Sequence, residues 1–203
     1  MIYIITGHYG SGKTEIAINL ALSLKIAEKA VAIIDLDLVN PYFRTKDAER
    51  LLTDRGIRVI SPQYANTNVD LPVVPAEIIS ALQGDGDVVI DVGGDDDGAI
   101  ALGQYNAYFQ NRRYEMYFVI NQKRPMTANA DDTVRLLREV ERASRLRVTG
   151  LIDNTNLKDQ TTAQDIDGGK ALTFTVSRAT GIPQIPRMPL TLFLNLPWEK
   201  EVL

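Results

Sequence analysis

A glycine-rich segment near the start of the chain contains the residue types needed to hold a phosphate chain. It follows the apolar run Ile2–Ile5 and consists of Gly7, His8, Tyr9, Gly10, Ser11, Gly12, Lys13 and Thr14. These residues match the pattern G-x-x-x-x-G-K-[ST] at every fixed position. Glycines let backbone N–H groups converge on phosphate oxygens, and the positive end of a helix that starts at Lys13 would face the same charge. We therefore expect all of these residues to bind a nucleotide, with Lys13 also acting in catalysis on the β- and γ-phosphates and with the Thr14 hydroxyl on Mg²⁺.

Two acidic residues, Asp35 and Asp37, follow a second apolar run with one leucine between them. Side chains two residues apart on an extended segment lie on the same face, so both carboxylates can face the phosphate site. We expect Asp35 to hold the metal, through a bound water, and Asp37 to orient an attacking water. A solvated acidic loop is the alternative, and the apolar residues before and between the acids argue against it.

A third acid, Asp91, ends the apolar run Val88–Ile90 and begins the pattern D-x-x-G, which finishes at Gly94. An acid in this place can hold Mg²⁺ through water, and the Gly94 N–H can bind a γ-phosphate. The following run Asp95–Asp97 is more typical of a solvated acidic loop or a helix cap than of metal ligands.

Apolar runs and helix-like segments alternate along the chain. The expected strands are Ile2–Thr6, Ala30–Asp35, Arg58–Ser61, Val88–Asp91, Met116–Asn121, Val148–Asp153 and Pro183–Pro186. The expected helices are Lys13–Glu28, Lys46–Arg55, Pro75–Gln83, Gly98–Arg112, Asp131–Leu146 and Thr162–Thr180. This alternation predicts one α/β domain over residues 1–203, with a mostly parallel sheet that helices cover on both faces. Because ligands bind at the carboxyl ends of such strands, the loop and the acids should meet at one edge.

Composition excludes several classes of partner and site. The net charge of −4 gives no electrostatic footprint for nucleic acid or an anionic membrane, and the arginines of residues 135–147 are typical of a solvated helix face. The chain has no cysteine, hence no disulfide and no thiolate metal ligand. The start has no basic leader, and no apolar run approaches the ~20 residues needed to span a bilayer. We expect a cytoplasmic protein.

Several segments together resemble the MinD/ParA/Mrp group of P-loop ATPases, which belong to the SIMIBI class. The helix after the loop contains Asn19-Leu20-Ala21, similar to the N-L-A helix of that group, and Asp35-Leu36-Asp37 resembles its D-x-D. Asn40-Pro41 stands where the Mrp branch has Gly-Pro. The resemblance runs in order through roughly residues 1–190 and is weaker in the middle. It implies the P-loop NTPase fold, an α/β three-layer sandwich with a mostly parallel sheet, and ATP and Mg²⁺ as cofactors.

The resemblance extends to the expected base site. Residues Val148–Asn154 resemble the strand of the Mrp branch that ends in an adenine-reading asparagine, and Ile185–Leu190 resemble its last strand, whose loop packs on the base. These matches imply that Asn154 and Pro189 contact the nucleotide. An amide can pair with the N6/N7 edge of adenine, although Asn154 could also be only a turn residue. Residues 121–124 lack the spacing and the Asp of a guanine-reading N-K-x-D string, and are typical of a strand end before the turn at Pro125.

Two departures from the family pattern are evident. His8 replaces the signature lysine, which in many members reaches across a dimer, and Tyr9 replaces a glycine. The cysteine pair with which the Mrp branch bridges an iron–sulfur cluster is absent. Near its reference pKa of ~6.5, a histidine is mostly neutral at pH 7, so a lysine-bridged dimer is not required, although a homodimer through another surface is possible. Alternatively, a bound triphosphate protonates His8, and hydrolysis then falls as pH rises.

Two classes of function remain open from the sequence. The first is a Mg-dependent ATP-binding protein and slow ATPase that acts as a nucleotide-dependent switch on an unidentified protein partner. The second is a P-loop kinase or ATP-dependent ligase that acts on a small molecule. The acids and the D-x-x-G favour the first, and the short connections leave little room for a kinase lid. Tyr42, Phe43 and Arg44 either contact a substrate or pack in the fold.

Overall fold

The computed structural model describes residues 1–26, 30–37, 48–61, 75–94, 96–110 and 112–186. Its centre is a six-stranded sheet in the order β3-β2-β4-β1-β5-β6, in which all of the pairs are parallel. The strands are β1 (Ile2–Gly7), β2 (Val31–Leu36), β3 (Arg58–Ile60), β4 (Asp87–Val92), β5 (Tyr114–Ile120) and β6 (Gly150–Asp153). The predicted α/β fold with a mostly parallel sheet is thereby confirmed.

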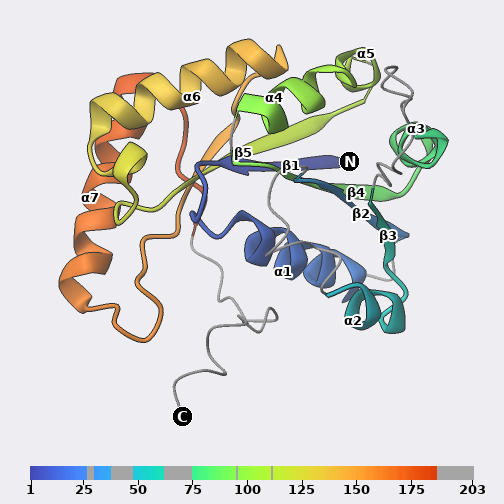
Figure 1. Cartoon of the computed structure of the whole chain (residues 1–203), viewed down its shortest axis with the longest axis horizontal. Coiled ribbons are helices and arrows are strands. Elements are labelled where there is room, and N and C mark those ends of the chain that lie inside the picture. Colours follow the sequence, from blue (N-terminus) through green and yellow to red (C-terminus); the bar gives the residue numbers. More distant parts are fainter. Residues whose placement is uncertain (27–29, 38–47, 62–74, 95, 111, 187–203) are drawn as a thin grey trace, which may run out of the picture.

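Helices cover both faces of the sheet (Figure 1). On one face lie α1 (Lys13–Ile26) and α2 (Glu49–Asp54). On the other lie α4 (Asp96–Gly103), α5 (Asn106–Phe109) and α6 (Ala130–Ser144), with α3 (Ala76–Gln83) and α7 (Ala163–Thr180) toward the two ends of the sheet and the short 3-10 turn η2 (Pro125–Thr127) before α6. None of the helices in the described part of the chain has the length and hydropathy that crossing a bilayer requires.

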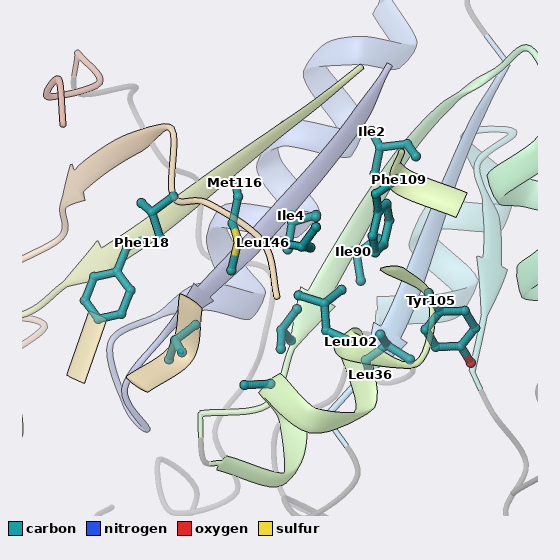
Figure 2. Close-up of a cluster of buried hydrophobic side chains, with 14 of the residues drawn as sticks. Ile2, Ile4, Leu36, Ile90, Leu102, Tyr105, Phe109, Met116, Phe118 and Leu146 are labelled. Carbon is teal, nitrogen blue, oxygen red and sulfur yellow. The ribbon is translucent and has the colours of Figure 1, made fainter. Parts of the chain in front are cut away.

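A buried apolar core fills the space between the sheet and the α4–α6 layer. Figure 2 shows the strand residues Ile4 and Ile90 beside the helical residues Leu102 and Phe109, with Phe118 farther along the same core. Strand positions of the opposite parity, such as Ile5, pack against α1 in a second core. Strands that are apolar on both faces must be covered by helices on both faces. The alternation of apolar runs with helical segments in the sequence therefore predicted the layered α/β fold.

The expected elements differ from the structure in two places. The helix predicted over Gly98–Arg112 is divided into α4 and α5 by a tight turn, in which the Gln104 and Tyr105 N–H groups donate to the Ala101 and Leu102 carbonyls at 3.2 and 3.1 Å. Gly103 lies so close to α6 that a Cβ there would be 2.8 Å from the Ala143 carbonyl oxygen. The strand predicted over Pro183–Pro186 is reduced to an isolated parallel bridge between Leu151 and Gln184.

Strand register brings the predicted site residues to one edge. Ile5 of β1 is paired with Asp91 of β4, and Asp91 is paired with Asp35 of β2. On the other side of β1, Gly7 is paired with Val119 of β5. The end of β1 therefore lies between acids that come from β2 and β4 and the turns that follow β5 and β6.

Candidate nucleotide-binding site

The loop from Gly7 to Thr14 leaves β1 and enters α1 through a tight turn. The Ser11 N–H donates to the His8 carbonyl at 3.1 Å, and Gly10 takes a φ of +70° at the third position of this turn. Gly12 has a φ of +88°, and a side chain there would collide with Asn154. Both positions need glycine because other residues rarely adopt such angles. The loop thus has glycine at two positions whose backbone conformation favours it.

Three side chains from three separate parts of the chain hold three carbonyl groups of the loop. Lys13 Nζ donates to the His8 carbonyl at 3.3 Å, Arg124 Nε to the Gly10 carbonyl at 2.8 Å, and Asn154 Nδ2 to the Ser11 carbonyl at 2.7 Å. These hydrogen bonds satisfy the three carbonyl oxygens and fix the conformation of the loop. Lys13 is only 6% exposed, which places its charge in a region of reduced screening.

Two buried carboxylates lie beside the loop. Asp35 is 3% exposed and Asp91 is fully buried. Burial, followed by the negative charge of Asp35, raises the pKa of Asp91 to about 7, while Lys13 and a hydrogen bond with the Thr14 side chain act in the opposite direction. Asp37 also contributes to raising this pKa, so its charge lies close enough to act on Asp91. The Asp37 N–H donates to Asp35 Oδ1 at 3.0 Å.

This set of donors fits a magnesium ion. Asp35, Asp91 and Thr14 provide hard oxygen atoms, and Mg²⁺ in phosphate sites takes one or two carboxylates, with waters and phosphate oxygens as its other ligands. A divalent cation would also relieve the repulsion between two buried like charges. The prediction that these three side chains share one place is thus supported by their positions.

Gly94 lies against the loop, as the D-x-x-G pattern predicts. A Cβ at this position would lie 2.5 Å from the Tyr9 nitrogen and 2.9 Å from Lys13 Nζ. A residue with a side chain could not approach so closely, so the Gly94 backbone is available to a group bound beside Lys13. The acidic run that follows leads into α4, which begins at Asp96.

His8 is partly buried, and its pKa is lowered by burial, then by the positive charges of Lys13 and Arg124. In the nucleotide-free protein the imidazole is therefore neutral at pH 7. Tyr9 is 55% exposed. Neither residue provides a fixed positive charge comparable with that of a lysine.

A cavity of about 270 Å³ lies on the far side of the loop from the acids. Its wall is formed by Ile16 of α1, Ile152 and Asn154 at the end of β6, Ile166 of α7, and Ile185. This volume is near the lower end of the range for small-molecule pockets, and its mainly aliphatic wall suits a flat aromatic ring. Asn154 connects this cavity to the loop through its hydrogen bond with Ser11.

The comparisons with known proteins agree with this geometry. Residues 2–190 match a family profile described as the CobQ/CobB/MinD/ParA nucleotide binding domain. The chain belongs to this family.

One curated relative is the cytosolic Fe-S cluster assembly factor cfd1 of Emericella nidulans, which is 34% identical over 97 residues. That match covers 47% of this chain and 27% of the relative, so the chain spans only part of its length. Among solved structures, FtsY of Thermotoga maritima superposes with a TM-score of 0.58 at 18% identity, over 91% of this chain and 60% of that chain. A nucleotide-binding protein of Archaeoglobus fulgidus in complex with ADP gives 0.52 at 17% identity, over 91% and 80%. At such identities the two structures show a shared fold.

Some predicted residues of this nucleotide-binding domain lie outside the described residues. They are Pro189, Tyr42, Phe43 and Arg44, and their roles stay predictions. Arg124, in contrast, was missed by the sequence analysis, which treated residues 121–124 as a strand end and turn. Its position directly after an apolar strand was the available signal. The order of the strands, which puts β5 beside β1, could not be derived from that signal.

Proposed function

We propose that this chain binds Mg·ATP at the Gly7–Thr14 loop and hydrolyses it slowly, as a nucleotide-dependent switch or accessory factor. One observation carries the proposal: strand register gathers Asp35 and Asp91 beside Lys13, and all three are buried at one edge of the sheet. Buried charges are costly, and such an arrangement is retained in proteins mainly where a charged ligand uses it.

The roles follow from the positions. Lys13 and the loop N–H groups bind the β- and γ-phosphates, and Gly94 offers its N–H to the γ-phosphate. Asp35, Asp91 and Thr14 hold Mg²⁺, which when bound neutralises charge on the phosphate oxygens. Asp37 orients the attacking water, as an acid at the margin of the site can do. The adenine lies in the cavity beside Asn154, with Pro189 in the loop that packs on it.

The target of the switch is proposed to be another protein. The relative cfd1 carries the name of an Fe-S cluster assembly factor, but this chain has no cysteine and so provides no thiolate for a cluster. The proposal therefore includes a protein partner without cluster chemistry, one domain over residues 1–203 and a cytoplasmic location. It includes no nucleic-acid or membrane partner, and a homodimer remains possible.

Turnover of ATP by the wild type and by Asp37→Ala tests this function. The wild type should release phosphate slowly and only with Mg²⁺. Asp37→Ala should keep Mg·ATP binding but slow turnover by at least roughly tenfold, because orienting the water acts on the transition state. Asp85→Ala is the matched control, since Asp85 is an exposed acid before the opposite end of β4.

Two results would count against this function. If Asp37→Ala turned over ATP as fast as the wild type, the water-orienting role of Asp37 would be refuted. Phosphate transfer to a member of a small-molecule panel, in place of release to water, would favour the kinase or ligase alternative.

A further inference from the structure

Arg124 lies directly against the nucleotide loop although it comes from a distant part of the chain. Its turn between β5 and η2 is fixed by two hydrogen bonds, from the Arg124 N–H to the Asn121 carbonyl at 3.0 Å and from the Thr127 N–H to the Arg124 carbonyl at 3.0 Å. A Cβ on Gly10 would lie 3.0 Å from Arg124 Nε and 3.2 Å from Cζ. The guanidinium group therefore packs on the Cα of Gly10 while Nε holds its carbonyl.

Arg124 makes no ion pair with an acid in the described part of the chain, whereas its neighbour Lys123 does. Lys123 Nζ is 2.5 Å from Asp165 Oδ1 and is neutralised by that pair. Arg124 has no such ion pair among the described residues, and there its hydrogen bond to Gly10 uses only Nε. The two terminal nitrogens of a guanidinium group are the ones that bind phosphate bidentately.

The arrangement of the strands shows which phosphates Arg124 would meet. The acids come from β2 and β4 on one side of β1, whereas Arg124 and the base cavity follow β5 and β6 on the other side. If the base lies in the cavity on the β5/β6 side and the terminal phosphate lies near Gly94 on the β2/β4 side, the phosphate chain must cross the loop between them. Arg124 therefore lies nearer to the phosphates that ADP and ATP share than to the terminal phosphate of ATP.

We propose that Arg124 is a second cation of the nucleotide site, which holds the Gly10 carbonyl through Nε and binds the α- and β-phosphates through its terminal nitrogens. The inference rests on the proposed function and adds a specific binding residue to it. It predicts that Arg124 contributes to the affinity for ADP and ATP equally and contributes little to the chemical step.

Calorimetric titration of the full chain with Mg·ADP and Mg·ATP at several salt concentrations tests this inference. Arg124→Gln should weaken both nucleotides by the same factor, about tenfold or more, as expected for the loss of a charged hydrogen bond. The dependence of affinity on salt should become shallower, because one phosphate-binding charge is lost. The KM for ATP should rise while kcat at saturating ATP stays within about twofold of the parent, which is the signature of lost uniform binding.

Two further variants make the result specific. Arg124→Lys keeps the charge and should recover part of the affinity and the wild-type salt dependence. Arg142→Gln removes one exposed arginine near the end of α6 and should change neither. A residue that only shaped the loop would lower affinity without changing the salt dependence.

The possible failures are distinguishable. If the wild type binds nucleotide and Arg124→Gln binds it with near-native affinity, this inference is overturned while the proposed function stands. A loss confined to ATP, or a loss with unchanged salt dependence, also overturns it. If the wild type binds neither nucleotide, the proposed function fails and this inference fails with it.

Discussion

The two sides of the nucleotide loop are held by different kinds of interaction. On the metal side, which comprises Asp35 and Asp91 with Thr14, two acids are buried next to each other, and the positive charge of Lys13 acts on Asp91 in opposition to that of Asp35. On the base side, which comprises the turns after β5 and β6, hydrogen bonds to carbonyl groups dominate. Asn154 holds Ser11, and Asn156 Nδ2 holds the Asn154 carbonyl at 2.7 Å.

The base side is thus preformed within the protein, whereas the metal side needs a bound cation to balance its charges. The base side has its geometry fixed by hydrogen bonds within the protein, such as that from Asn121 Nδ2 to the Asn156 carbonyl at 3.2 Å. The metal side holds like charges whose repulsion a cation would relieve. We therefore expect substitutions on the metal side to act through charge. On the base side, apart from Arg124 and the Lys123–Asp165 ion pair, we expect substitutions to act through geometry and base recognition.

The largest effect is expected for Lys13→Ala, which removes the positive charge that acts on Asp91 and that we propose binds the phosphates. A charged hydrogen bond is worth about 1.5–3 kcal/mol or more when it is partly desolvated, so ATP binding should fall below detection while the fold survives. Calorimetry and circular dichroism on the same sample check both statements. Lys25→Ala, at the other end of α1, is the control. Near-native affinity in Lys13→Ala would mean that the loop is not the triphosphate site.

A smaller effect is expected on the base side for Asn154→Ala. The variant loses the hydrogen bond to Ser11 and the proposed contact with adenine, so affinity should fall about tenfold and stability by about 1 kcal/mol. Titration with ATP and GTP, together with urea unfolding, measures both. Asn106→Ala removes a comparable bond, to the Arg145 carbonyl at 3.0 Å, far from the loop, and should leave affinity unchanged. An unchanged preference between ATP and GTP in Asn154→Ala would refute the base-reading role.

Much of the site could be predicted because its main parts are contiguous in sequence or end apolar strands. The loop is a local motif, and Asp35 and Asp91 follow runs that can only be buried strands. The contact of Arg124 with Gly10 and that of Asn154 with Ser11 depend on strand order and side-chain reach, which periodicity does not encode. The approach of Gly103 to the Ala143 carbonyl of α6, just before the turn that divides α4 from α5, is likewise a tertiary contact.

The smallest effect concerns the outer wall of the base side, where Asp165 caps α7 and pairs with Lys123. The Lys123 hydrogen bond, followed by bonds from Thr162, lowers the pKa of Asp165 from 3.8 to about 2. The ionised form thus stabilises the fold above about pH 4, and this contribution is lost as pH falls toward 2. The stability difference between wild type and Asp165→Asn should therefore shrink over that range.

Urea unfolding at several pH values between 5 and 2 measures this difference. Asp167→Asn removes another acid from the same helix and controls for the change in net charge. A stability difference that stays constant with pH would show that the ion pair does not contribute through charge.

Titration of the wild-type chain with ATP and with GTP, each with Mg²⁺ and with EDTA, tests the central claim most directly. We predict one ATP per chain, a large loss of affinity in EDTA because Asp35 and Asp91 then face the phosphates without Mg²⁺ between them, and weaker binding of GTP. Absence of binding, binding that does not depend on Mg²⁺, or a preference for GTP would contradict it.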